Sequence, residues 1–204
     1  MYKKYIKQII DTIIAIILLI LLFPLILIIG IITFIDLGFP LHNTIRLREG
    51  KNKKPFVMYK FRTKVLGKEY VTDGSQYTKV SYIIDRLRLN ELPQLINVIK
   101  GDMALVGPRP FIPNDNLPDI KRPDERYFVK PGMTGLAQVS GGRNLTHKQI
   151  LEYDVVYYNN LNFLNDLKIV IKTPMSLINK KTFKKWKFFI FNIICYRIQR
   201  LMIH

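Results

Sequence analysis

Asn90 and Glu91 stand where a polar turn meets the start of a periodic apolar segment. Asparagine is a favoured N-cap, and Pro93 falls in the first turn of the expected helix, where its missing N–H costs little. Phosphate groups favour a helix N-terminus because its amides are free and its dipole is positive there. Carboxylate oxygens are ligands that Mg²⁺ takes. This segment therefore predicts a site for phosphate and a divalent cation, with Glu91 as the metal ligand.

A stiff basic loop follows this helix. Pro108 and Pro110 flank Arg109, whose planar guanidinium matches the geometry of phosphate oxygens. Phosphoryl transfer requires cations that clamp the phosphate, a divalent ion and a nucleophile in line. Other side chains could complete such a site: Lys60, Arg62, Lys130 and Arg143 as clamps, with Asp154 and Asp166 as further carboxylates. Each has a structural alternative, such as an acid in a first helical turn or a charge on a solvated helix face.

The elements that must position these residues are expected to form one α/β, helix-rich domain with few strands. Apolar residues at helical spacing predict helices before and after Asn90, and the second should end at Gly101. Segments rich in glycine and proline predict loops. The expected elements are an extended segment at 55–61, helices at 79–89, 90–100, 147–159 and 165–179, loops at 62–77 and 130–135, and a loop or short helix at 114–126.

The N-terminal residues 1–37 are expected to enter a membrane. No charge occurs at 13–35, and about 20 apolar residues are enough to cross a bilayer. Pro24 removes a helical hydrogen bond inside the segment, and both flanks are basic, which favours the cytoplasmic side for both. A helix that breaks at Phe23 and Pro24 and returns satisfies both features, whereas a simple signal-anchor span is the alternative. A cleaved signal peptide is disfavoured because the apolar run is long and no small-residue cleavage site follows.

Composition limits the classes of function. Lysine and arginine number 32 against 15 acidic residues, and the formal net charge of +17 attracts polyanions. The single cysteine, Cys195, and three dispersed histidines argue against internal disulfides and a cysteine-rich or histidine-based metal site. Beyond a cytoplasmic domain at 38–180, the tail at 181–204 mixes basic and aromatic residues, which is typical of a lipid headgroup layer. Core packing or binding of single-stranded nucleic acid are alternatives for this tail.

Four blocks of sequence, in order, resemble the bacterial sugar transferases, the monotopic phosphoglycosyl transferases that prime capsule, O-antigen, exopolysaccharide and glycoprotein assembly. The central block at 90–110 reads NELPQLINVIKGDM followed by ALVGPRP. The blocks YKFRT at 59–63 and KPGMTGLAQV at 130–139 lie on either side of it, and a late helical block contains Asp154 and Asp166. Several long motifs in the expected order make a chance match a poor explanation.

This resemblance implies a re-entrant N-terminal helix, interfacial helices and a small domain on the cytoplasmic face of a bacterial inner membrane. It implies Mg²⁺ as cofactor, a UDP-sugar as donor and undecaprenyl phosphate as acceptor, with release of UMP in the first membrane step of surface glycan assembly. Membrane lipids are further expected partners, nucleic acid is not, and a homodimer is left open. The catalytic positions would be Asn90 and Glu91, with Glu91 on the metal. The substrate-binding positions would be Lys60, Arg62, Pro108, Arg109, Pro110, Lys130, Thr134, Gln138, Arg143, Asp154 and Asp166.

Asn90 departs from the family pattern. An Asp-Glu pair usually begins the central motif, where the Asp attacks the β-phosphate of the donor and the Glu helps to hold the metal. An amide is a poor nucleophile. Three explanations follow: Glu91 attacks, the lipid phosphate attacks directly while Glu91 holds the metal, or the chain is inactive. The intact remainder of the motif favours an enzyme. An inactive homologue that docks at the membrane as partner of an active transferase is the alternative, and a nucleic-acid binder is disfavoured by the carboxylate-bearing motif.

Overall fold

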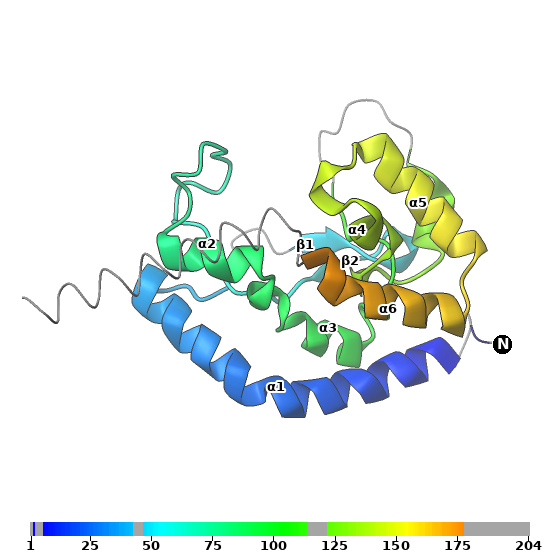
Figure 1. Cartoon of the computed structure of the whole chain (residues 1–204), viewed down its shortest axis with the longest axis horizontal. Helices are drawn as coiled ribbons and strands as arrows, with labels where there is room; N and C mark the ends of the chain where they lie inside the picture. Colours follow the sequence, from blue (N-terminus) through cyan, green and yellow to red (C-terminus); the bar gives the residue numbers. More distant parts are fainter. Residues whose placement is uncertain (1, 3–5, 43–46, 114–121, 178–204) are drawn as a thin grey trace, which may run out of the picture.

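The computed structural model describes residues 2, 6–42, 47–113 and 122–177 (Figure 1). The expected helix-rich class with a few short strands and a long apolar N-terminal helix is confirmed. The helices are α1 (Lys7–Leu37), α2 (Lys79–Arg86), α3 (Gln94–Lys100), α4 (Leu136–Ser140), α5 (His147–Asn159) and α6 (Phe163–Leu177). The strands are β1 (Leu47–Glu49), β2 (Pro55–Val57), β3 (Ala104–Val106) and β4 (Gly132–Thr134). Short 3₁₀ turns are η2 (Lys51–Lys53), η3 (Leu89–Glu91), η4 (Asp124–Tyr127) and η5 (Gly142–Asn144).

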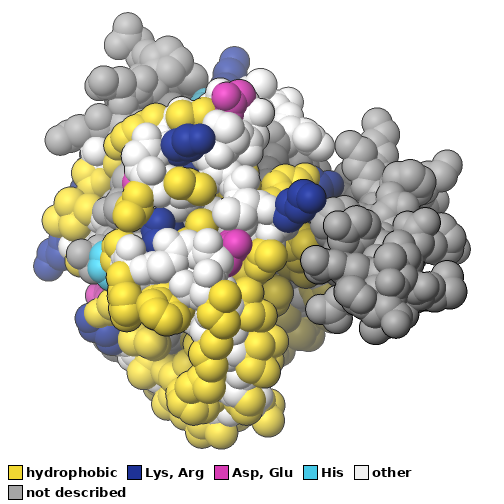
Figure 2. Space-filling model, turned by 90° about the vertical axis from the view of Figure 1, so that its left-hand side faces the viewer, with side chains coloured by type: hydrophobic (Ala, Val, Ile, Leu, Met, Phe, Trp, Pro, Cys, Tyr) yellow, Lys and Arg dark blue, Asp and Glu magenta, His cyan; other side chains and the backbone are white. Residues whose placement is uncertain are grey.

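The helix α1 has 31 residues, continues through Pro24 and follows a curved course (Figure 1). The helix is therefore not interrupted at Phe23 and Pro24 as expected, since a proline removes one hydrogen bond from a helix without having to end it. By length and composition α1 is able to cross a membrane. Ile20 and Leu21 are each 69% exposed, and hydrophobic side chains cover the lower part of the molecule in Figure 2. So large an apolar surface requires a covering other than water.

A buried ion cluster fastens the beginning of α1 to the rest of the protein. The Nζ of Lys7 lies 3.1 Å from Asp11 and 2.7 Å from Asp166 of α6. Tyr2 and Tyr157 donate hydrogen bonds to the two oxygens of Asp166, at 2.7 and 2.9 Å respectively. Buried charges are tolerated when they are paired and hydrogen-bonded. The cluster therefore sets where α1 meets α5 and α6.

Arg62 fastens the other end of α1. Its guanidinium donates hydrogen bonds to the carbonyls of Leu37 at 2.6 Å, Gly38 at 2.9 Å and Pro40 at 2.8 Å. The last carbonyls of a helix have no partner within the helix, and basic side chains commonly satisfy them. Arg62 is only 2% exposed. It thus joins the end of α1 to the chain segment that leads into the central part of the domain.

The helix α3 packs on α1 and carries a buried amide. Leu95 and Val98 form a core with apolar side chains of α1. Asn97, which is fully buried, donates to the carbonyl of Val57 at 2.8 Å and accepts from the backbone N–H of Tyr59 at 2.9 Å. These two bonds hold the segment after β2 against α3.

The backbones of two segments that are far apart in sequence come into close contact at glycine residues. The strands β3 and β4 pair in parallel, with Ala104 opposite Gly132, so the loop expected at 130–135 contains a strand. A Cβ on Gly132 would lie 2.0 Å from the backbone nitrogen of Gly107, and one on Gly135 would lie 2.1 Å from the Gly107 carbonyl oxygen. Only glycine permits backbones to approach this closely. The basic loop after β3 is thereby held against β4 and the start of α4.

The expected helices are present as α2, α5 and α6. The helix expected to begin at Asn90 begins at Gln94 instead, because η3 intervenes and the Asn90 side chain bonds to Asp85 rather than to a first-turn amide. Gly101 ends α3 as expected, with a left-handed φ of 84°. The basic aromatic tail expected at 181–204 lies outside the described residues.

The Arg62 contacts predict a stability effect. Replacement by lysine keeps the charge but leaves a single ammonium that cannot reach carbonyls on several sides, so Arg62→Lys should lose about 1–3 kcal/mol of folding free energy. For a chain of this size we expect the thermal midpoint, measured by circular dichroism in detergent, to fall by about 2–4 °C per kcal/mol. Arg86→Lys, which changes an exposed bond to Tyr82, serves as control. An unchanged midpoint for Arg62→Lys would contradict the proposed role of Arg62.

Candidate active site

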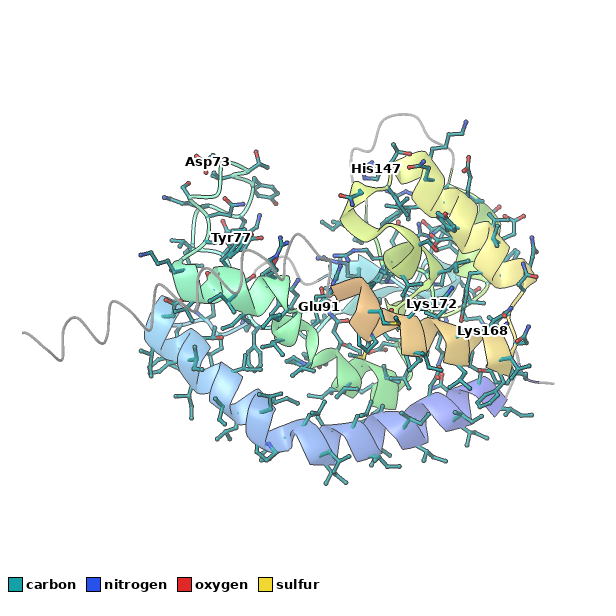
Figure 3. The ribbon with its side chains drawn as sticks, viewed as in Figure 1. Asp73, Tyr77, Glu91, His147, Lys168 and Lys172 are labelled. Atoms are coloured by element: carbon teal, nitrogen blue, oxygen red, sulfur yellow. The ribbon has the colours of Figure 1, made fainter. Side chains whose placement is uncertain are left out.

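A cavity of about 270 Å³ lies between the η3–α3 junction and the first turn of α5. Figure 3 shows Glu91 and His147 at these two places. Polar residues of the lining come from several segments: Arg48, Lys60, Glu91, Gln94, Arg109, Gln138 and His147. Apolar side chains complete the wall: Met58, Pro110, Phe111, Ile112, Met133 and Ile150. The cavity thus combines one carboxylate with several cations and amides beside an apolar wall.

Glu91 is the carboxylate of this cavity. Its Oε1 lies 3.5 Å from the Nζ of Lys60 and 3.2 Å from Nη1 of Arg88, and its side chain is 14% exposed. Arg88 has a φ of 56°, in the left-handed region that is uncommon for residues other than glycine. This conformation reverses the chain after α2 and places the guanidinium beside Glu91. Backbone strain of this kind is often found at functional sites.

The charges around Glu91 shift its titration and that of Lys60. Burial on its own raises the pKa of the Glu91 carboxyl, but the nearby Lys60, Arg109 and Arg88 outweigh it, so the pKa lies below the ordinary value. Burial lowers the pKa of the Lys60 ammonium, and Glu91 partly opposes this. Three cations around one ionised carboxylate leave an excess of positive charge. A phosphate-bearing ligand is the natural complement of such a cavity.

The loop that carries Arg109 is held from two sides. Nη2 of Arg126 donates to the Arg109 carbonyl at 2.6 Å, and its guanidinium lies 3.7 Å from the centre of the Phe111 ring. The backbone N–H of Glu49 donates to the carbonyl of Phe111 at 2.8 Å. Arg109 is therefore presented from a fixed backbone while its side chain remains exposed. Such an arrangement suits repeated binding and release of an anion.

Gln138 reaches the cavity from α4 with an open acceptor. Its Oε1 is buried and has no hydrogen-bond partner within the part of the chain that the structure describes. A buried acceptor without a partner costs about 1–3 kcal/mol, so the site favours a ligand that donates a hydrogen bond here. Gly135 makes room for this amide, because a Cβ there would lie 2.6 Å from Oε1.

Asn90 lies behind Glu91 and is 0% exposed. Its Nδ2 donates to Oδ1 of Asp85 at 3.2 Å. Asp85 was not among the residues expected at the site. It stands five positions earlier in the chain and on the far side of a helix end, so no periodicity indicates that the two side chains meet.

Four of the expected substrate-binding residues have structural contacts instead. Arg62 and Asp166 hold the two ends of α1. Lys130 donates to a glutamine of α1, and the hydroxyl of Thr134 lies 2.8 Å from that of Thr173 on α6. Each of these groups ties the domain to α1 or to α6, and none of them is among the residues that line the cavity.

The structure brings other expected residues together and shows some that were missed. The cavity lining includes Lys60, Glu91, Arg109, Pro110 and Gln138. Pro108 lies beside them, and its carbonyl accepts a backbone N–H from β4 at 2.9 Å. Arg143 lies in η5, and its side chain is outside what the structure describes. The missed residues are Arg88 beside Glu91 and these residues of the lining: Arg48, Met58, Gln94, Phe111, Ile112, Gly132, Met133, His147 and Ile150. Arg88 could have been found from its spacing of three residues before Glu91, whereas nothing in the sequence indicates the approach of His147.

Asp154, also expected at the site, forms a buried ion pair with Arg126. The two side chains are each 3% exposed, and Nη1 lies 3.2 Å from Oδ2. Burial raises the pKa of Asp154 to about 7, although the arginine opposes this shift. The pair supports the Arg109 loop from behind, because the same guanidinium binds the Arg109 carbonyl.

The cavity fits one mode of magnesium binding. Among the described residues no group of three histidine, cysteine, aspartate or glutamate side chains could hold a metal. Mg²⁺ in phosphoryl-transfer sites often takes only one or two carboxylates and completes its shell with substrate phosphates and water. Glu91 offers such a carboxylate beside cations that suit phosphates. A metal that arrives with a diphosphate ligand is therefore compatible with these residues.

The structure thus combines a helix that is long and apolar enough to cross a membrane with a cationic cavity that contains one carboxylate. Comparison with known proteins identifies the family. The family model for bacterial sugar transferases matches residues 2–180. The chain belongs to the bacterial sugar transferase family.

Several known sugar transferases are similar to this chain in sequence. The sugar transferase EpsL of Bacillus subtilis (strain 168), described as uncharacterized, is 40% identical over 138 residues, which cover 65% of this chain and 68% of that protein. The undecaprenyl-phosphate galactose phosphotransferase of Salmonella typhimurium is 33% identical, over 65% of this chain and 32% of the relative. The UDP-glucose:undecaprenyl-phosphate glucose-1-phosphate transferase of Xanthomonas campestris is 34% identical, over 66% of this chain and 31% of the relative. The match thus spans about a third of the two longer enzymes.

The raised pKa of Asp154 predicts a pH dependence of stability. The folded protein holds this proton at higher pH than the unfolded chain does, so the contribution is fully present below the ordinary pKa of 3.8 and is lost as the pH rises to about 7. The thermal midpoint of the wild type minus that of Asp154→Asn should therefore fall between about pH 4 and about pH 7. Asp124→Asn, at an exposed ion pair, serves as the surface control. A difference for Asp154→Asn that is constant or rises with pH would contradict the assignment.

Proposed function

We propose that this protein transfers a sugar-1-phosphate from a UDP-sugar to undecaprenyl phosphate and releases UMP, as the first membrane step of surface glycan assembly. The observation that carries the proposal is the cavity in which Glu91 lies among Lys60, Arg88 and Arg109. The family membership and the activities named for the relatives from Salmonella and Xanthomonas support it.

The cavity suits the diphosphate of a nucleotide-sugar. Lys60 and Arg109 would bind the phosphate oxygens, and their charge would stabilise the negative charge that develops as the bond to UMP breaks. The ionised Glu91 would hold the Mg²⁺ ion, which when bound supplies further neutralisation of the phosphates. Arg88 and Lys60 keep Glu91 ionised and fixed in place. Positioning and electrostatics are the main contributions that a protein can make to this reaction.

The open acceptor of Gln138 suits the sugar. A hydroxyl group of the donor would give its buried Oε1 the hydrogen bond that it lacks among the described residues. The neighbouring wall of Met58, Phe111 and Met133 is apolar and would cover the less polar face of a ring. The identity of the sugar would then depend on which hydroxyl reaches Gln138.

The helix α1 suggests how the protein is anchored and how it would reach a lipid acceptor. We propose that α1 enters the bilayer from the cytoplasmic face of the inner membrane and returns to that face. Its curved course (Figure 1), its exposed apolar surface and the basic residues on both flanks support this arrangement. A polyprenyl phosphate would then stay in the lipid while its phosphate approaches the cavity. The buried Asn90 favours a second candidate function, an inactive homologue that partners an active transferase.

The proposed activity predicts a strong effect at Glu91. Purified protein in nanodiscs would receive undecaprenyl phosphate, Mg²⁺ and a panel of UDP-sugars, and UMP release would be measured. Glu91→Gln should lower turnover by on the order of 10²-fold or more, because the amide neither binds the metal as well nor balances the cations. The exposed Glu152→Gln on α5 should retain the wild-type rate. Folded wild-type protein that releases no UMP from any donor would favour the inactive partner.

The re-entrant arrangement predicts that both flanks of α1 face the same side. In a background with Cys195 replaced by serine, single cysteines at Lys4 and Lys51 would be exposed to a membrane-impermeant maleimide in inverted and right-side-out vesicles. Both positions should be labelled only in inverted vesicles, where the cytoplasmic face is outside. Labelling of the two positions in opposite vesicle types would show a helix that crosses the bilayer and contradict re-entry.

A further inference from the structure

The turn between α2 and η3 brings a second carboxylate next to Asn90, the residue that precedes the cavity carboxylate Glu91. Asp85 stands in the last turn of α2, and the left-handed Arg88 reverses the chain behind it. The N–H of Arg88 donates to the Asp85 carbonyl at 3.1 Å, and the N–H of Glu91 donates to the Arg88 carbonyl at 3.0 Å. This tight reversal folds Asn90 back on the helix end, where its Nδ2 lies 3.2 Å from Oδ1 of Asp85.

In the hydrogen bond between Asn90 and Asp85, Asn90 is the donor. An ionised carboxylate only accepts hydrogen bonds, so the nitrogen end of the Asn90 amide must face Asp85. Asn90 itself is 0% exposed, whereas Asp85 is partly exposed. Asp85 is thus the more accessible residue of the pair.

Asp85 is held as part of the charged cluster. Thr63 donates to its Oδ1 at 3.4 Å, and the hydroxyl of Tyr77 donates to its Oδ2 at 3.5 Å. Asp85 and Glu91 also share a cation, Lys60. Burial lowers the pKa of the Lys60 ammonium, and the negative charges of both carboxylates oppose this shift. The site thus has two carboxylates near one ammonium, although the residue immediately before Glu91 is an amide.

We propose that Asp85 is the nucleophile of this transferase and takes the role that an aspartate at position 90 would have. The proposal rests on the proposed function. An oxygen of the ionised Asp85 carboxylate forms a bond to the phosphorus that carries the sugar, and the bond from that phosphorus to UMP breaks with its electrons on the UMP phosphate. An oxygen of the polyprenyl phosphate then attacks the same phosphorus. The bond to Asp85 breaks, the carboxylate is regenerated, and the polyprenyl-diphosphate-sugar is released.

Asn90 has a positioning role in this scheme. Its Nδ2 holds Oδ1 of Asp85, and in the proposed scheme Oδ2, which accepts the longer bond from Tyr77, is the oxygen that attacks. The amide therefore orients the carboxylate without competing with it. An aspartate at position 90 beside Asp85 would instead place two carboxylates in contact, and like charges at that distance do not both ionise readily.

The test moves the carboxylate between the two positions. Asp85→Asn should lower UMP release by on the order of 10³-fold, whereas the exchange variant Asp85→Asn/Asn90→Asp should recover most of that loss. With donor alone and a rapid acid quench, peptide mass spectrometry of the wild type should find the phosphosugar adduct on Asp85. In the exchange variant the adduct should be found on the aspartate introduced at position 90.

Thermal midpoints by circular dichroism show whether each variant folds, and Asp124→Asn provides a surface carboxylate control. Wild-type turnover together with an unchanged rate for Asp85→Asn, or an adduct on Glu91, would overturn the assignment of Asp85 and leave the transferase activity standing. A folded Asp85→Asn variant that is inactive and is not rescued by the exchange would also overturn it. Absence of UMP release from the folded wild type would contradict the proposed function itself.

Discussion

The long helix α1 has an exposed apolar surface and also contacts the domain through buried polar groups, and the rest of the structure depends on these contacts. Most of its side chains are apolar and exposed, while its few buried polar groups face the domain. At the beginning of α1, Lys7 and Asp11 form an ion cluster with Asp166. At the end of α1, Arg62 donates hydrogen bonds to backbone carbonyls. Both ties are buried, and buried charge is stable only with its partners in place. The domain is therefore fixed on α1 at two points.

The two ties also set the position of the cavity. Arg62 follows Lys60 closely in the chain, so the residue that holds the end of α1 also limits where the cavity ammonium can lie. At the opposite side, glycine contacts hold the Arg109 loop against β4 and α4. Cations from separate segments thereby converge on Glu91. With α1 in the bilayer as proposed, the charged cavity is open to a nucleotide from water and lies above the lipid that would supply the acceptor.

Much of the fold was predictable from sequence because its signals are local. The apolar length of α1, the periodicity of α2, α5 and α6, and the glycine end of α3 all depend on neighbouring residues. The strand β4 was missed because its pairing with β3 is long-range and its glycines resemble a loop. The helix start was misplaced at Asn90 because N-cap preference cannot reveal that the amide has a different partner in Asp85.

The site was predictable in part for the same reason. Motif membership indicated Lys60, Glu91, Arg109 and Gln138, which line the cavity. It did not distinguish them from Arg62, Lys130 and Thr134, whose motif positions serve packing against α1 and α6. A motif records that a residue type is required but does not state whether a ligand or the scaffold requires it. His147 and Asp85 reach the site only through tertiary structure.

The central claim is that the cavity beside Glu91 receives the donor, and methionine methyl groups test it directly. Met58 and Met133 line the cavity, whereas Met103 is fully buried in the core and Met175 is exposed on α6. Protein with ¹³C-labelled methionine methyl groups in nanodiscs would be titrated with UDP-sugar and Mg²⁺ and followed by NMR. We expect saturable shifts of the Met58 and Met133 signals, with the signals of Met103 and Met175 unchanged. Saturable binding that leaves Met58 and Met133 unmoved, or that shifts Met175 instead, would contradict it.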